Sequence, residues 1–87
     1  MPDAFPYELS EHAAVVIRER GIRLTWVQHA IERPARVEPD AADPELRHAL
    51  ATVPEFGDCV LRVIYNHSTR PWRIVSVYFD RSMKGRL

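Results

Sequence analysis

The sequence has few of the residues that small proteins use to reinforce a fold or to hold a metal. Its 87 residues include a single cysteine, Cys59, which excludes an internal disulfide and a zinc site built on paired cysteines. No apolar stretch approaches the roughly 20 residues that cross a bilayer. The first residues, MPDAFPYEL, lack the positive region and apolar run of a signal peptide. We therefore expect one cytoplasmic domain over residues 1–87, with its core at 9–80 and no membrane partner.

The four histidines also lack the spacing of a metal site. No two of them lie four residues apart, as a pair of ligands on one helix face would. We therefore expect no metal and no cofactor. His29 and His67 fall at surface positions, and the alternation of its strand places His48 on the solvent side of an edge strand.

The net charge of zero conceals an uneven distribution. Residues 1–59 carry a charge of −5, whereas residues 60–87 carry +5. Two interpretations are open: the basic third binds an anionic partner, or the two halves neutralise each other within the molecule. The short basic tail, 81–87, either contacts a phosphate backbone or keeps the end of the chain in water.

Two helices are predicted before residue 35. Ser10 is suited to cap the first, and Gly21 to end it in the left-handed conformation. Thr25 and Gln28 have the spacing of a capping box that opens a second helix, which Pro34 ends. Helical spacing in the first segment gives one stripe, formed by Ala13, Val16, Ile17 and Arg20.

Strand-like alternation replaces the helical pattern after Pro34. The predicted strands are short and separated by tight turns, which favours antiparallel pairing. They cover 35–39, 47–53, 59–66 and 72–79. We therefore predict an α+β fold in which two N-terminal helices pack on one face of a three- to four-stranded antiparallel sheet. Arg62 and Arg73 occupy positions in these strands that look apolar, so they either extend into solvent at a sheet edge or converge on an anion.

Several segments resemble one known family. SEHAAVVIRERGI, WVQHAIERPARVEPD, LRVIYN and WRIVSVYFDRSMK resemble the DUF4258 family over roughly Leu9 to Lys84. Its members begin with a Ser-x-His-Ala segment and reach an Arg-Gly-Ile break. That family is similar in turn to the BrnT and RelE-like toxins, small bacterial α+β proteins that cleave RNA and are neutralised by an antitoxin encoded beside them. The chain departs from the family at Val15 to Ile17, where an Arg-Met pair is usual, and this departure weakens the catalytic interpretation.

The resemblance implies candidate site residues. RNA cleavage without a metal needs a base, an acid and cations that stabilise the charged phosphorus centre. The matching candidates are His12 as general acid or base, Arg62 and Arg73 as phosphate clamps, and Tyr78 as an auxiliary donor. The candidate RNA contacts are Arg47, Arg81, Lys84 and Arg86. Tyr65, Tyr78 and Trp72 are candidates for stacking on a base. The alternative for His12 is a boundary histidine bonded to a backbone carbonyl.

Two functions follow from these candidates. The first is a metal-independent RNA-cleaving protein of a toxin-antitoxin pair, with RNA and an antitoxin as partners. The second is a non-catalytic interaction or assembly module on the same scaffold. The zero net charge argues against an RNA-binding protein, and the basic last third argues for one. An exposed edge strand at 36–39 would suit either an antitoxin or a second copy of the chain in a homodimer.

Overall fold

The computed structural model describes residues 5–87, so the first four residues of the segment inspected for a signal peptide lie outside the described part. Two helices, α1 (Glu11–Arg20) and α2 (Leu24–Glu32), follow a two-residue strand, β1 (Glu8–Leu9). The other strands are β2 (Arg36–Pro39), β3 (Leu46–Val53), β4 (Cys59–Asn66) and β5 (Arg73–Phe79). Two short 3-10 helices complete the chain, η1 (Pro54–Phe56) and η2 (Arg81–Met83).

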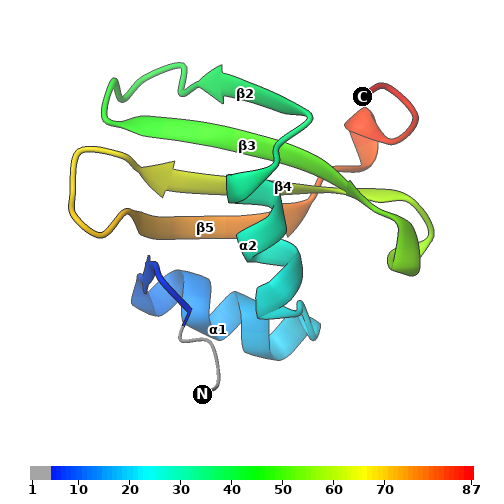
Figure 1. Ribbon diagram of the computed structural model, residues 1–87, viewed down its shortest axis with the longest axis horizontal. Helices are drawn as coiled ribbons and strands as arrows, with labels where there is room; N and C mark the ends of the chain where they lie inside the picture. The colour runs from blue at the N-terminus through cyan, green and yellow to red at the C-terminus, as the bar shows by residue number, and fades with distance from the viewer. Residues whose placement is uncertain (1–4) are drawn as a thin grey trace.

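The five strands form one mixed sheet in the order β1-β5-β4-β3-β2 (Figure 1). Pairing is antiparallel from β2 to β5, and β1 joins β5 in parallel. The predicted α+β class and the two N-terminal helices are confirmed. The predicted strands from β2 to β5 pair antiparallel, but the prediction missed β1, because a strand of two residues is too short to show an alternating pattern.

The helix ends follow their sequence signals in α1 and depart from them in α2. The side chain of Ser10 accepts a hydrogen bond from the Ala13 N–H at 3.0 Å, and Gly21 adopts a φ of 64°. The predicted capping box at the start of α2 was wrong. Arg23 stands at the N-cap without a side-chain bond, and Gln28 donates to Glu32 one turn later.

The core lies between the two helices and one face of the sheet. Alternate residues of β3, β4 and β5 point toward the helices, as the strand period of two requires. The largest buried contributors on this face are Leu61, Val63, Tyr65, Ile74 and Val77. They pack against Ala13, Ile17, Val27, Ala30 and Ile31 of the helices. This arrangement accounts for the apolar stripes of both helices.

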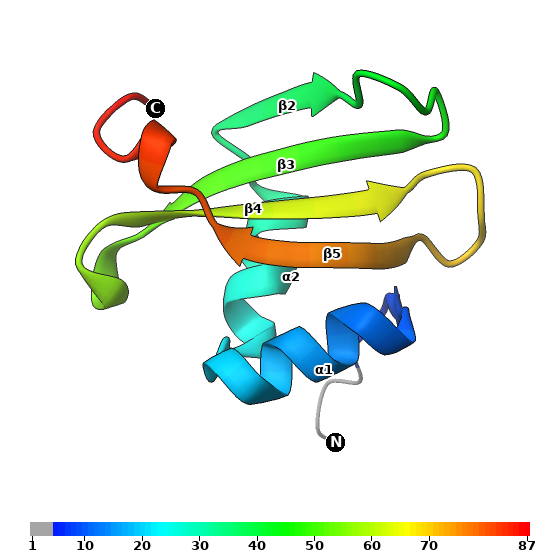
Figure 2. The ribbon, with the colours of Figure 1, turned by 180° about the vertical axis from the view of Figure 1, so that it is seen from behind.

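The opposite face of the sheet is partly covered by the end of the chain. After β5 the chain crosses β4 on the side away from α2 (Figure 2), and the Asp80 N–H donates to the Val60 carbonyl at 2.8 Å. Leu50 and Val60 are buried although they alternate away from the helix-facing core. No helix within residues 5–87 is long and apolar enough to span a membrane.

Candidate functional site

A groove runs around one edge of the sheet, between α1, the second half of β5 and the segment that contains η2. Its volume is about 540 Å³. The polar side chains that line it include His12, Arg20, Tyr78, Arg81 and Lys84. We call it the His12 groove. The helical spacing in α1 explains one wall, because His12 and Arg20 lie on either side of Val16 along the helix.

The groove exists because β5 is only partly covered by a neighbouring strand. β1 pairs with β5 at Arg73 and Ile74 alone, after which the chain turns into α1. The backbone N–H of Asp80 donates to Val60 of β4. In an antiparallel pair, the backbone N–H and C=O groups of successive residues point alternately toward and away from the partner strand. Those of Val77 and Phe79 therefore point away from β4. Both residues line the His12 groove. Backbone N–H and C=O groups of this part of β5 therefore remain free of strand pairing on the side of the groove.

The cations of the His12 groove are not neutralised by neighbouring carboxylates. Within residues 5–87, no acidic side chain lies within 4.0 Å of Arg20, Arg81 or Lys84. The acidic residue that lines the groove, Asp80, is held by Arg62 at 2.9 Å. His12 is exposed, and its ring makes no hydrogen bond to the described residues. The groove therefore combines a free imidazole with free positive charge.

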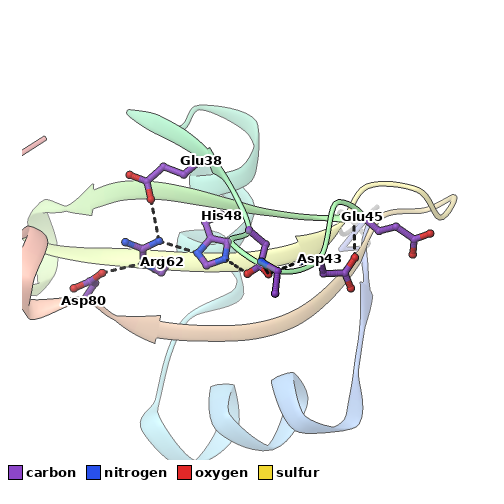
Figure 3. Close-up of polar contacts among 8 residues, drawn as sticks. Glu38, Asp43, Glu45, His48, Arg62 and Asp80 are labelled. Atoms are coloured by element: carbon purple, nitrogen blue, oxygen red, sulfur yellow. Dashed lines mark hydrogen bonds and ion pairs between the residues drawn. The ribbon is translucent and has the colours of Figure 1, made fainter.

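A second polar group of residues lies on the sheet face away from the helices (Figure 3). We call it the open-face cluster, and it comprises Glu38, Asp40, His48, Arg62 and Asp80. Arg62 lies at its centre, donating from Nε to Asp80 at 2.9 Å and from Nη1 to Glu38 at 3.3 Å. The same Nη1 is 2.8 Å from Nδ1 of His48. The side chain of Arg62 is only 12% exposed.

The neighbours of His48 determine its tautomer. A guanidinium has no acceptor, so Nδ1 of His48 must accept the bond from Arg62. Nε2 then carries the proton and donates to Asp40 at 2.7 Å, which lowers the pKa of that carboxyl. The prediction that His48 is exposed on an edge strand was wrong, since β3 lies inside the sheet and the side chain is 15% exposed. Because both ring nitrogens are engaged, His48 is not placed to act as a base.

Asp80 connects the open-face cluster to the His12 groove. Its carboxylate accepts bonds from the Ser82 backbone N–H at 3.0 Å and from the Ser82 hydroxyl at 2.6 Å, so it caps η2. These bonds, together with Arg62, hold the pKa of Asp80 below its usual value against the opposing effect of burial. Arg81 and Lys84 reach the groove from this capped turn. Arg62 therefore positions groove residues without lining the groove itself.

The profile of a family described as a domain of unknown function, DUF4258, matches residues 9–79. The chain belongs to the DUF4258 family. Neither a comparison with curated proteins nor one with solved structures gives a match. The match ends at the last residue of β5, so His12, Arg20 and Tyr78 lie inside the DUF4258 region and Arg81 and Lys84 lie beyond it.

In this DUF4258 chain the four predicted catalytic residues do not meet at one point. His12 and Tyr78 line the same groove. Arg62 is the cross-strand partner of Tyr78, yet its guanidinium is bound within the open-face cluster. Arg73 lies at the other end of β5, where Nε is 3.8 Å from Glu8. The two predicted phosphate clamps are thus engaged by carboxylates.

The predicted RNA contacts are also divided between locations. Arg81 and Lys84 line the His12 groove, whereas Arg47 and Arg86 are exposed and do not line it. Among the predicted stacking residues, buried Tyr65 packs its ring on that of Trp72, with centroids 4.9 Å apart. These two aromatic rings belong to the packing of the domain. Tyr78 alone of the three is exposed and in the groove.

Sequence reasoning missed two residues of the groove, Arg20 and Phe56. Arg20 occupies a position of the otherwise apolar stripe of α1, and a cation at such a position was a usable sign of a special environment. Phe56 sits between Pro54 and Gly57 in the turn that follows β3, an unusual place for a large aromatic side chain. Within residues 5–87, no group of three histidine, cysteine or acidic side chains is placed to hold a metal ion.

Proposed function

We propose that the His12 groove binds RNA and cleaves it without a metal ion. The observation that carries the proposal is the joint presence of His12, Tyr78 and unpaired cations in one groove. An RNA phosphodiester is an anion next to one ribose 2′-hydroxyl, and the groove residues supply the charge, hydrogen bonds and proton transfer that its cleavage needs. The clamps of this proposal are Arg20, Arg81 and Lys84, in place of Arg62 and Arg73.

The proposed reaction is attack of a ribose 2′-hydroxyl on the adjacent phosphorus. His12 accepts the proton of that hydroxyl, because its ring nitrogens have no other partner among the described residues. The 2′-oxygen to phosphorus bond forms and the phosphorus to 5′-oxygen bond breaks. The Tyr78 hydroxyl donates a proton to the departing oxygen, and the cations stabilise the charge that accumulates on phosphorus. The products are a 2′,3′-cyclic phosphate and a 5′-hydroxyl.

The resemblance of DUF4258 to BrnT and RelE-like toxins supports the same proposal. In this interpretation the two helices and the sheet are a variant of the RelE-like fold, and the chain is one half of a toxin-antitoxin pair. The free edge of β2 is the proposed antitoxin site. Val37 is exposed there, and Pro39 limits uncontrolled pairing because it lacks an N–H.

Cleavage of a labelled oligoribonucleotide by the purified protein in the presence of a chelator tests the proposal. We expect fragments that end in a 2′,3′-cyclic phosphate, and we expect His12→Gln to lower the rate by about 10² to 10⁴, the usual contribution of a general base. His29→Gln is the matched control, because His29 is exposed on α2 and outside the His12 groove. Full activity of His12→Gln, or intact RNA with excess wild-type protein, would overturn the proposal.

The contribution of the groove cations is measured by the salt dependence of RNA binding. Replacing Arg81 by alanine should remove about one unit from the slope of log affinity against log salt, because one phosphate contact is lost. Arg86→Ala, outside the groove, should leave the slope unchanged. Equal slopes for Arg81→Ala and the wild type would contradict the assignment of Arg81.

A protein-interaction module remains the alternative function, and the edge strand β2 favours it. In that case a strand of a partner or of a second copy adds to β2. A Val37→Lys variant separates the two functions, because a charge at the edge should block strand addition and leave RNA cleavage intact. The expected readout is loss of a dimer or complex in size-exclusion chromatography.

A further inference from the structure

One large aromatic side chain, Phe56, is exposed beside the His12 groove. It closes η1, and the following residues Gly57 and Asp58 both have positive φ, at 63° and 59°. The Phe56 ring stacks on Phe79, with centroids 4.8 Å apart and planes at 22°, and it lies 5.6 Å from the ring of Trp26. Even so, Phe56 is 49% exposed. The Phe56 ring is therefore fixed by its contacts with Phe79 and Trp26, while about half of the residue's surface is open to solvent.

Phe56 lines the same groove as the unpaired cations. Of the other predicted stacking residues, Tyr65 is buried under Trp72 at the opposite end of β4. Tyr78 is exposed in the same groove, where the proposed function uses its hydroxyl as a proton donor. A flat apolar surface in the same groove as Arg81 and Lys84 is complementary to a nucleotide, which joins a flat base to a phosphate. An acidic peptide would use the same cations but would gain less from an aromatic ring held in one orientation.

We propose that Phe56 stacks on an unpaired base, so that the groove selects single-stranded RNA. This inference rests on the proposed function and adds the substrate class to it. In a duplex each base is already stacked on its neighbours, and its flat surface is not available to a side chain. In a single strand the bases can turn outward onto an aromatic ring while their phosphates contact the groove cations. Because every base has such a surface, little sequence preference is expected.

Binding of an RNA that cannot be cleaved tests the stacking independently of the reaction. The probes are a short strand with a 2′-O-methyl group on every ribose, the duplex of the same strand, and inorganic polyphosphate, which has no bases. We expect Phe56→Ala to weaken binding of the single strand by about 5- to 150-fold, the usual effect of losing one base stack. Binding of polyphosphate should not change. The wild type should bind the single strand more tightly than the duplex.

Two further variants protect this test against loss of folding. Phe56→Leu keeps an apolar side chain against Phe79 and Trp26 but has no aromatic surface, so it should share the binding defect with a normal unfolding midpoint. Val37→Ala removes another exposed apolar side chain, far from the groove on edge strand β2, and should bind like the wild type. If Phe56→Leu binds the single strand normally, the stack is overturned.

The outcomes distinguish this inference from the proposed function. Equal binding of duplex and single strand, or a parallel loss of polyphosphate binding in Phe56→Ala, would overturn the stack while leaving cleavage by His12 intact. Phe56-dependent binding of a single strand with no cleavage of natural RNA would support the stack and remove the nuclease. Absence of binding to any RNA overturns both.

Discussion

Arg62, on strand β4, and the cations of the His12 groove, on α1 and around η2, are in opposite electrostatic situations. Arg62 donates to Asp80 and Glu38 and meets His48, and its side chain is largely shielded from water. Arg81 and Lys84 have no carboxylate within ion-pair distance among residues 5–87. The comparison shows that residue type alone does not tell which arginines are free to bind an anion. A cation whose donors are already used has little left to offer a phosphate.

The same comparison bears on the two interpretations of the uneven charge. Part of the basic last third is neutralised within the molecule, because Arg62 and Arg73 pair with Glu38 and Glu8 of the acidic part. Another part, which includes Arg81 and Lys84, forms no ion pair among residues 5–87. Neutralisation within the molecule is therefore confirmed for Arg62 and Arg73, and binding of an anionic partner stays a prediction for the other cations. Arg81 and Lys84 share the His12 groove, whereas Arg70 and Arg86, also without an ion pair among residues 5–87, lie outside it.

The largest expected effect on stability comes from breaking the open-face cluster. Arg62→Met removes the partner of two partly buried carboxylates, and we expect the free energy of unfolding to fall by about 2 kcal/mol. Arg73→Met is the matched control on the neighbouring strand. Its ion pair is long and about half exposed, so a loss of no more than about 0.5 kcal/mol is expected. Urea unfolding measures both, and equal losses would show that the two arginines are not in different situations.

A smaller effect is expected in acid. Because the pKa of Asp80 is lowered in the folded protein, by its bonds from Ser82 and Arg62, the folded state binds this proton less readily than the unfolded state. The stabilisation is therefore complete above the ordinary pKa of 3.8 and is lost as the pH falls through the lower folded value.

Melting temperatures measured from pH 5 downward check this sign. Asp80→Asn cannot titrate, so it should lose less stability than the wild type over the same range. The proposed RNA binding should also weaken in this variant at neutral pH, because Asp80 both holds Arg62 and caps η2, which carries Arg81. A wild type that keeps its full stability in acid would contradict the role given to Asp80.

The smallest expected effect is in alkali and concerns Tyr7, on the helix side of the molecule. Burial, together with the bond from its hydroxyl to Glu32 at 3.1 Å, raises the pKa of Tyr7 from 10.0 to about 12. Here the folded state holds the proton more tightly, so the stabilisation is complete below pH 10.0 and is lost as the pH rises toward 12. Tyr7→Phe should show a flatter decline in melting temperature over this range. An identical decline in both proteins would exclude Tyr7 as its cause.

Much of the fold was predictable because it depends on local patterns. The serine cap and the glycine stop define α1, Pro34 follows the end of α2, and the alternation in 47–53 and 59–66 correctly separates the two sheet faces. Two features of the fold were not predicted correctly from local patterns, and each has a physical cause. β1 is formed by pairing with β5 rather than by its own two residues, and the start of α2 lacks the cap that its sequence suggested.

The candidate site was predictable only in its residue types. The sequence by itself determined that His12 opens a helix, that Tyr78 lies on a strand and that the last third is rich in arginine, because these depend on neighbours within a few residues. The tertiary structure decided which cations stay free. That depends on Arg62 meeting Asp80 and Glu38, which lie 18 and 24 residues away from it in the chain. Ion pairs and grooves are made by such distant contacts, and no local pattern reports them.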